Sequence, residues 1–259
     1  MPNFDSFESV PRRELDVIYV LDTSGSMNGL PIQRLNAAMG NTVDALQQMA
    51  RHNGNAHVKI AVLEFNSMCR WMQPAGPEDL EDFFWTDLEA SGMTYMGTAL
   101  KELNSKLSRH AFLNSMTGSF LPVIIFMTDG YANDDYEVEL AKIMQNKWFR
   151  NATRVGFAIG RNPDVQMIAK LVGDSEAVIR TEDLGVFARL LRFVTVSAST
   201  LASTSHTVDA AASGAAAVAS AINDAGVDRD QVAPGFDYKE QDVFPQEPGT
   251  SDWDDISGW

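Results

Sequence analysis

An apolar run that ends abruptly in an acid constrains this chain more than any other feature. Residues 17–21 are five apolar residues, mostly β-branched or aromatic, and they lead directly into Asp22. The run is too short for a buried helix and predicts a strand buried on both faces, as in a parallel sheet. A carboxylate at the end of such a strand is costly to bury unless a positive charge lies against it.

The residues after this strand offer oxygen ligands. Asp22, Ser24 and Ser26 lie two apart in a glycine-bearing loop. Three oxygen donors suit a hard divalent cation, Mg²⁺ first, with Ca²⁺ or Mn²⁺ as alternatives. The same stretch is also consistent with an Asp/Ser turn that caps the next helix, so on its own it leaves both interpretations open.

Two distant stretches favour the metal site. Residues 91–100 form a glycine-bearing loop with Thr94 just before a helix, and residues 123–127 form a second buried strand that is followed by Asp129. In this order, the Asp-x-Ser-x-Ser loop, the loop threonine and the strand-end acid resemble the von Willebrand factor A domain. In that family the triple is the metal-ion-dependent adhesion site. The resemblance implies a metal shell of Asp22, Ser24, Ser26, Thr94 and Asp129.

The order of elements predicts an α/β fold. Strand patterns over residues 17–21, 58–65, 123–127, 154–159 and 177–180 alternate with helical patterns over 35–49, 96–107, 136–148, 164–171 and 183–193. We expect a doubly wound, mostly parallel, Rossmann-like sheet with helices on both faces. Residues 69–72 are predicted to add one antiparallel edge strand, and residues 79–84 a helical turn. Ligands of such sheets bind beyond the carboxyl ends of the strands. The resemblance implies that the strands ending at Asp22 and Asp129 are neighbours there.

The chain divides into three predicted parts. Residues 1–13 form a short lead, residues 14–200 the A domain, and residues 201–259 a tail that is alanine-rich and then acidic. The resemblance covers about residues 14–195 and is closest to bacterial stand-alone A-domain proteins of the TerY/YegL type. Residues 128–130, 133–135 and 196–200 are similar to that subgroup, whereas Met93 departs from the small residue expected before the threonine.

The predicted tail combines charge with aromatic residues. Residues 200–259 hold eleven acidic and two basic residues, which predicts a largely disordered segment. Residues 208–225 are a low-complexity run that forms at most a weak helix. A docking role for the end of the tail rests on Trp253, Asp254, Asp255, Ile256 and Trp259. Docking to a partner protein, occupancy of this chain's own metal site and a purely solubilising role all remain open.

Composition excludes several partners. The net charge of −15 argues against nucleic acid and anionic membranes, which reward clustered Lys and Arg. No apolar run reaches the ~18 residues of a membrane span, and residues 1–13 do not form a signal peptide. The lone cysteine, Cys69, cannot form an internal disulfide. We therefore expect a cytoplasmic protein.

Motifs of common enzymes are missing from the sequence. It holds neither a phosphate-binding Gly-x-x-x-x-Gly-Lys loop nor a Gly-x-Ser-x-Gly elbow, and its four histidines are not spaced as a zinc pair. Asp22 lacks the strand-end lysine that a phospho-accepting aspartate needs. We expect no enzyme but a module that binds a partner's Asp or Glu through its metal.

The subgroup implies an adaptor in a bacterial stress-response or defence set with a protein kinase and a phosphatase. The alternative is a subunit that partners an AAA+ ATPase of the MoxR or chelatase type. A Mg²⁺-dependent phosphohydrolase is less favoured.

Overall fold

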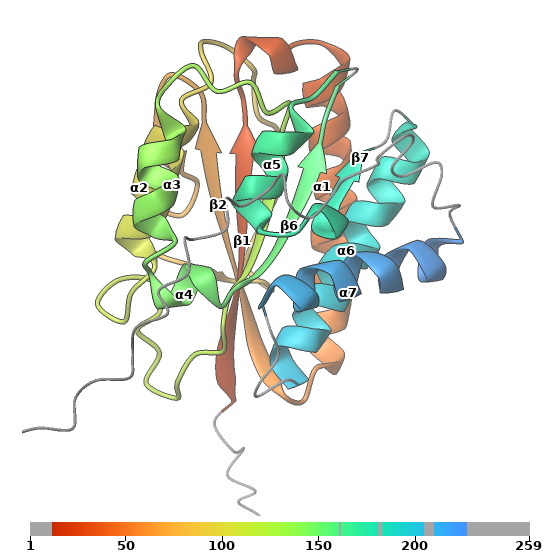
Figure 1. The fold of residues 1–259 in the computed structure, drawn as a ribbon. Helices are drawn as coiled ribbons and strands as arrows, with labels where there is room; N and C mark the ends of the chain where they lie inside the picture. Colours follow the sequence, from red (N-terminus) through yellow and green to blue (C-terminus); the bar gives the residue numbers. More distant parts are fainter. Residues whose placement is uncertain (1–11, 161, 181–182, 205–209, 227–259) are drawn as a thin grey trace, which may run out of the picture.

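The computed structural model of the chain describes residues 12–160, 162–180, 183–204 and 210–226, and it centres on one sheet (Figure 1). The parallel strands are β1 (Arg13–Asp22), β2 (Ala56–Phe65), β5 (Val123–Thr128), β6 (Thr153–Ala158) and β7 (Val178–Arg180). Strands β3 (Cys69–Trp71) and β4 (Glu78–Asp79) pair antiparallel to β2. The order β3-β2-β1-β5-β6-β7 confirms the predicted α/β fold and its antiparallel edge. Strand β4 ends at Asp79, the first residue of the helical turn expected over residues 79–84, and a single turn follows in which Asp82 N donates to Asp79 O (3.0 Å).

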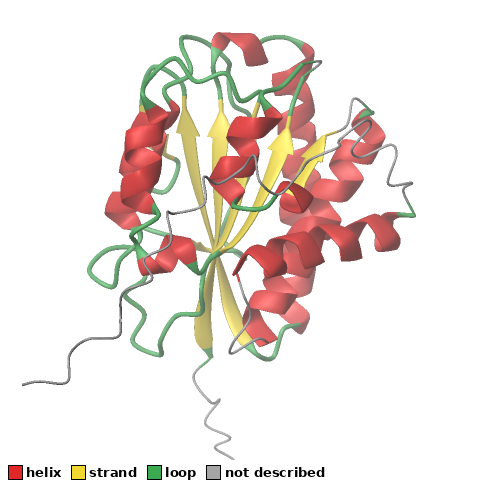
Figure 2. Cartoon of the chain, viewed as in Figure 1, coloured by secondary structure: helices red, strands yellow, loops and turns green. Residues whose placement is uncertain are grey.

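Helices cover both faces of the sheet (Figure 2). One face carries α1 (Leu30–His52), α6 (Leu184–Thr204) and α7 (Ala210–Ala225). The other face carries α2 (Met96–Lys106), α3 (Tyr136–Ile143), α4 (Lys147–Arg150) and α5 (Val165–Val172). Two single 3₁₀ turns, η1 (Gly25–Met27) and η2 (Ser175–Ala177), complete the described elements.

Strand β1 is the central strand, and its side chains alternate between two hydrophobic clusters. Val17, Tyr19 and Leu21 pack toward α1 and α6, whereas Ile18 and Val20 pack toward α2 and α5. All five are fully buried. A strand buried on both faces needs apolar residues at successive positions, which is the pattern that residues 17–21 show.

The helix expected over residues 136–148 is two helices, because Asn146 interrupts it. The side-chain oxygen of Asn146 accepts a hydrogen bond from Trp148 N (2.9 Å) and so caps α4. Its side-chain nitrogen donates to Leu107 O (3.0 Å). An asparagine that offers local hydrogen bonds to the backbone competes with continued helix, and α3 ends before it.

The described fold continues past residue 200, to Gly226. Helix α6 runs well beyond the predicted residues 183–193, and residues 210–225, assigned from sequence to the tail, form α7. Buried residues of α7 join the cluster beneath α1 and α6: Ala217, Val218, Ala221 and Ile222. The predicted docking residues of the tail lie outside the described part of the chain.

Helix α6 also bears on the expectation that no segment could span a membrane. Its residues Gly185–Ser203 have a mean hydropathy of 1.3 over 19 residues, which is long and apolar enough for a span. Length and composition alone do not distinguish such a span from a core helix. In this fold Leu190, Leu191 and Val194 of α6 are fully buried in the core.

Candidate metal centre

The site lies where the carboxyl ends of β1 and β5 meet, at the upper edge of the sheet in Figure 1. These strands are parallel neighbours, with Leu21 opposite Met127. Strand β2 lies on the other side of β1, so the strand order reverses between β1 and β5. Asp22 and Asp129 therefore come from adjacent strand ends at the place where α/β sheets bind ligands.

Asp22 is completely buried and held by hydrogen bonds on both oxygens. Ser24 N donates to its Oδ1 (2.8 Å), and the hydroxyl of Thr128 donates to its Oδ2 (2.6 Å). Burial first, and then the charge of Asp129, raise the pKa of the Asp22 carboxyl to about 6, although these hydrogen bonds oppose the shift. The carboxylate is thus oriented by neutral donors, and no Lys, Arg or His among the described residues forms an ion pair with it.

The two serines lie together on the loop after β1. Their Oγ atoms are 3.0 Å apart. Ser24 is buried and precedes the 3₁₀ turn η1, whereas Ser26 lies within that turn and is exposed. The tight turn therefore brings both hydroxyls to the side of Asp22, with Ser26 toward solvent.

The loop that carries Thr94 is hydrogen-bonded to the serine loop and to the segment after β5. Gly25 N donates to Gly92 O (2.9 Å), which joins this loop to the serine loop. Thr94 N donates to the side chain of Asn133 (2.8 Å), and Asn133 N donates to Thr94 O (2.8 Å). These bonds join the Thr94 loop to the segment after β5, and Thr94 is almost fully buried.

Asp129 follows β5 and is largely buried. Its Oδ1 accepts a long hydrogen bond from Tyr131 N (3.4 Å). The next residue, Gly130, has φ +84°, and a Cβ there would lie 2.5 Å from Asp164 O. Only glycine allows the chain to turn so closely past α5 while it keeps Asp129 at the edge.

The structure thus brings the five predicted residues to one edge on three linked loops. Sequence reasoning missed Thr128, whose hydroxyl both orients Asp22 and accepts from Gly130 N (2.9 Å). It also missed the role of Asp134, whose carboxylate accepts hydrogen bonds from Gly97 N and Thr98 N at the start of α2 (3.0 Å each). The run of residues 133–135 was noted only as a mark of the subgroup.

The donor set fits a hard divalent cation. Among the described residues, no three or more His, Cys, Asp or Glu side chains are grouped so that they could hold a metal ion. The edge instead offers two carboxylates and three hydroxyls, the oxygen chemistry that Mg²⁺, Ca²⁺ and Mn²⁺ prefer. Within the described part of the chain, no ion pair with Lys, Arg or His involves either carboxylate.

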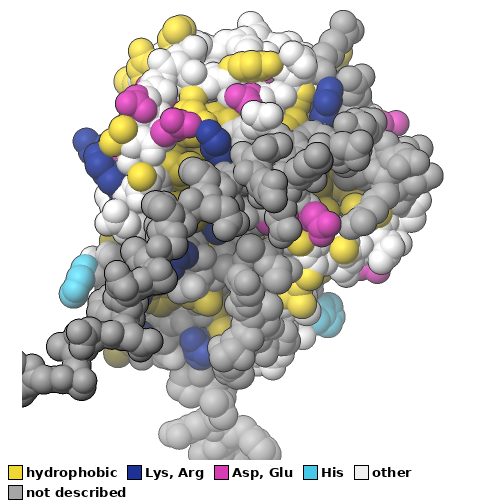
Figure 3. Space-filling view, viewed as in Figure 1, with side chains coloured by type: hydrophobic (Ala, Val, Ile, Leu, Met, Phe, Trp, Pro, Cys, Tyr) yellow, Lys and Arg dark blue, Asp and Glu magenta, His cyan; other side chains and the backbone are white. Residues whose placement is uncertain are grey.

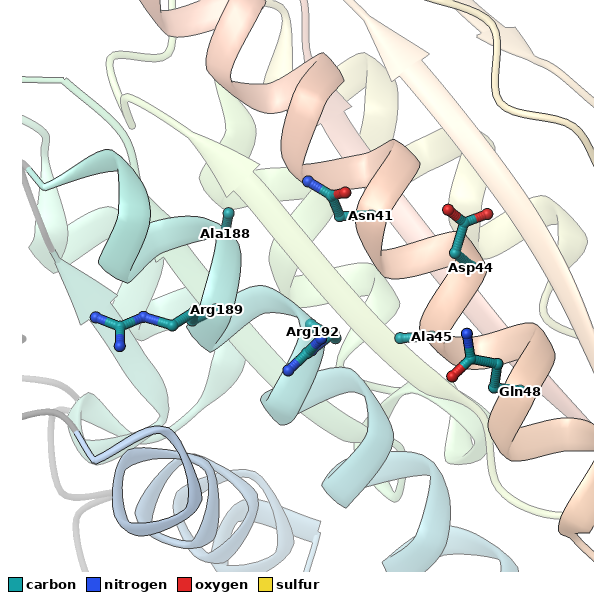
Figure 4. Close-up of a pocket in the computed structure, with 7 residues that line it drawn as sticks. All are labelled: Asn41, Asp44, Ala45, Gln48, Ala188, Arg189 and Arg192. Carbon is teal, nitrogen blue, oxygen red and sulfur yellow. The ribbon is translucent and has the colours of Figure 1, made fainter.

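A separate hollow of about 320 Å³ lies between α1 and α6 (Figure 4). Asn41, Asp44 and Gln48 line it from α1, and Arg189 and Arg192 line it from α6. It contains none of the five predicted residues, so it is not part of the metal edge.

Comparison with known families defines the class of protein. The profile of the von Willebrand factor type A domain matches residues 16–190, and the chain belongs to this family. No curated protein sequence matches the chain.

Solved structures share the fold at low sequence identity. A von Willebrand factor type A protein from Catenulispora acidiphila is 18% identical, with a TM-score of 0.55 over 72% of this chain and 42% of that one. Proximal thread matrix protein 1 of the mussel byssus, in a structure with zinc in its metal-ion-dependent adhesion site, is 20% identical, with a TM-score of 0.51 over 73% and 46%. The pilus adhesin SpaC of Lactobacillus rhamnosus GG is 11% identical, with a TM-score of 0.53 over 71% and 30%. This chain thus spans less than half the length of each.

Proposed function

We propose that this chain is a protein-binding module whose binding requires Mg²⁺, with Ca²⁺ or Mn²⁺ as alternatives. Ser24, Ser26 and Thr94 would hold the cation directly, and Asp22 and Asp129 would orient it, partly through water. The cation would supply an electrophilic position for an Asp or Glu carboxylate of the partner.

One observation carries this proposal. Two carboxylates converge at the sheet edge among hydroxyls and backbone donors, and the pKa of Asp22 is raised to about 6 by burial and by Asp129. Such a pair is unfavourable on its own and becomes favourable when a cation lies between the charges. Because the remaining ligands are neutral hydroxyls, much of the cation's charge stays available to a partner's carboxylate.

The surroundings of Asp22 support binding over hydrolysis. A nucleophilic carboxylate needs an oxygen free to attack its substrate. Asp22 is completely buried, and both of its oxygens already accept hydrogen bonds. We therefore propose that the chain is not an enzyme.

We further propose that the chain belongs to the TerY/YegL-type subgroup and acts as an adaptor beside a kinase and a phosphatase in a stress-response or defence set. Support comes from residues 133–135, because Asn133 holds Thr94 and Asp134 holds the start of α2. Partnership with an AAA+ ATPase is the alternative, and a cytoplasmic location remains a prediction.

Metal titration tests the site directly. Calorimetry with Mg²⁺ and Mn²⁺ should show one site in the wild-type chain and a loss of at least ~tenfold in affinity for Thr94→Ala. Thr98→Ala is the matched control, since Thr98 lies four residues after Thr94, in the first turn of α2, and is exposed. Equal affinities for the wild-type chain and Thr94→Ala would contradict the proposed ligand set.

Partner capture tests the function. Proteins retained by the immobilised full chain in Mg²⁺ should be released by EDTA and should not be retained by Thr94→Ala. Turnover of a phosphomonoester with Mg²⁺ that is lost in Asp22→Asn would instead favour a phosphohydrolase.

A further inference from the structure

Large exposed apolar side chains stand on the loops that build or adjoin the metal edge. Eight large apolar residues are well exposed in the described part of the chain, and half of them stand on the segments that build or adjoin the site. These four are Leu30 (60% exposed), Met68 (74%), Met93 (50%) and Tyr131 (51%), here called the apolar collar. In Figure 3 hydrophobic side chains lie along the upper edge of the molecule, above the strand ends.

The backbone places the collar residues beside the site. Met93 N donates to the Ser67 hydroxyl (2.8 Å), which joins the loop of Met93 to the turn that carries Met68. Tyr131 follows Asp129 and its N–H donates to that carboxylate. Leu30 begins α1 directly after the serine loop. The four collar residues therefore stand on segments that build or adjoin the site, and apolar side chains exposed together on a surface mark interaction sites.

The collar and the metal edge together define a ligand. Its centre must be a carboxylate, which Asp22 and Asp129 would repel unless a cation is bound. Its flanks must be large apolar side chains, because these gain from burial against the collar. Methionines adapt to aromatic partners and are common on surfaces that bind peptides.

We propose, resting on the proposed function, that the apolar collar and the metal edge bind residues 253–259 of this same chain. That segment places Asp254 and Asp255 between Trp253 and Ile256, with Trp259 beyond. It lies outside the described residues, at the end of 33 residues that follow Gly226. At ~3.3 Å per residue these can span up to ~100 Å, well beyond the ~17 Å radius of gyration of a domain this size. A tethered ligand also has a local concentration on the order of millimolar. Its carboxylate would hold the open position until a partner displaces it.

Peptide binding to the full chain tests this inference. The probe is a fluorescent peptide of residues 251–259, followed by anisotropy with the chain variant D254N/D255N, whose own tail lacks the carboxylates. We expect binding in Mg²⁺ and at least ~tenfold weaker binding in EDTA or with the peptide that carries both Asn substitutions. The wild-type chain should bind the peptide at least ~tenfold more weakly than D254N/D255N does, because its own tail competes.

Collar variants provide the matched comparison, made in the D254N/D255N chain. Met68→Ser and Met93→Ser should each weaken peptide binding about fivefold, whereas Met116→Ser, an exposed methionine outside the collar, should leave it unchanged. A chain that binds Mg²⁺ but not the peptide overturns this inference alone. A chain that binds no divalent cation overturns the proposed function and this inference with it. Equal binding by the wild type and D254N/D255N, or Mg²⁺-dependent dimers of the wild type, overturns occupancy within one molecule.

Discussion

Asp129 adds a negative charge beside Asp22, and this charge costs stability when no cation is bound. We predict that Asp129→Asn raises the melting temperature in EDTA at pH 8, by an effect of about 1 kcal/mol, because the repulsion is relieved. Mg²⁺ should stabilise the wild type and leave the variant unchanged. Thermal denaturation in both conditions measures this.

Asp134 gives the control for that prediction. Its carboxylate accepts two backbone hydrogen bonds at the start of α2, so Asp134→Asn should destabilise the protein with or without Mg²⁺. A lower melting temperature of Asp129→Asn in EDTA would show that the carboxylate is stabilising even without the cation.

The residues proposed as ligands could be predicted from sequence because a strand end and a serine repeat mark Asp22, Ser24 and Ser26, and the resemblance to the A domain then implies Thr94 and Asp129. Thr128 could not be found in this way. Its hydroxyl meets a carboxylate that is 106 residues away in the chain, and this contact depends on β1 and β5 being neighbours. A threonine inside an apolar strand pattern gives no sign of such a contact, since β-branched residues are common there.

Asp16 is a second buried carboxylate on β1, six residues before Asp22 and therefore about 20 Å from it along the strand. Within the described residues neither of its oxygens has a hydrogen-bond partner. Burial, and then the charge of Glu14, raise the pKa of Asp16 to about 7, against 3.8 for an ordinary Asp. The folded state therefore binds this proton more tightly than the unfolded chain, so stability from this group falls as pH rises from about 4 to about 7.

We predict that Asp16→Asn removes this pH dependence. In EDTA, its free energy of unfolding should be close to that of the wild type near pH 4 and exceed it by a few (~2–4) kcal/mol at pH 8. Urea denaturation across this range measures the difference between the two proteins. A difference that stays constant with pH would mean that Asp16 is not the group that titrates.

At the scale of elements, the apolar patterns predicted the sheet and most helices. Hydrogen bonds of polar side chains determine where some of these helices end. The helix expected over residues 136–148 divides because Asn146 bonds to the end of α2, a contact with no sequence signal. Helix α7 was expected only as a weak helix within the tail, and its packing against the core was missed for a different reason. An alanine-rich run lacks the large apolar stripe that marks a core helix, yet its small residues allow close packing.

Gly214 in α7 illustrates that close packing. A Cβ at this position would lie 2.3 Å from Arg154 O on β6. We predict that Gly214→Ala destabilises the protein by about 1–3 kcal/mol, because the helix must move away from the sheet. The control is Gly40→Ala in α1, where nothing lies within 4 Å of the new Cβ. That change should stabilise by about 0.5–1 kcal/mol through helix propensity. Chemical denaturation of both variants decides whether α7 is packed as described.

At the scale of the whole molecule, the two faces of the sheet differ in whether the helices that cover them lie within the segment that matches the A-domain family. The face toward α2 is covered by helices within the segment that matches the A-domain family. The face toward α1 is covered partly by α6, whose end lies beyond that segment, and by α7, which lies wholly beyond it. The hydrophobic core of this chain therefore extends further along the sequence than the family match does.

This extension predicts where the chain can be shortened. A protein that ends at residue 226 keeps every described element, whereas one that ends at residue 200 loses α7 and the last turn of α6. Val218 and Ile222 are buried, and each contributes about 1.5–3 kcal/mol by leaving water. We therefore expect, by urea denaturation in EDTA, that the shorter protein loses more than about 3 kcal/mol and that the longer one matches the full chain. Hydrogen exchange should show the loss first in β6, which α7 contacts through Gly214. Equal stability of the two truncated proteins would mean that α7 adds nothing to the core, and that the domain ends near residue 200 as its sequence suggests.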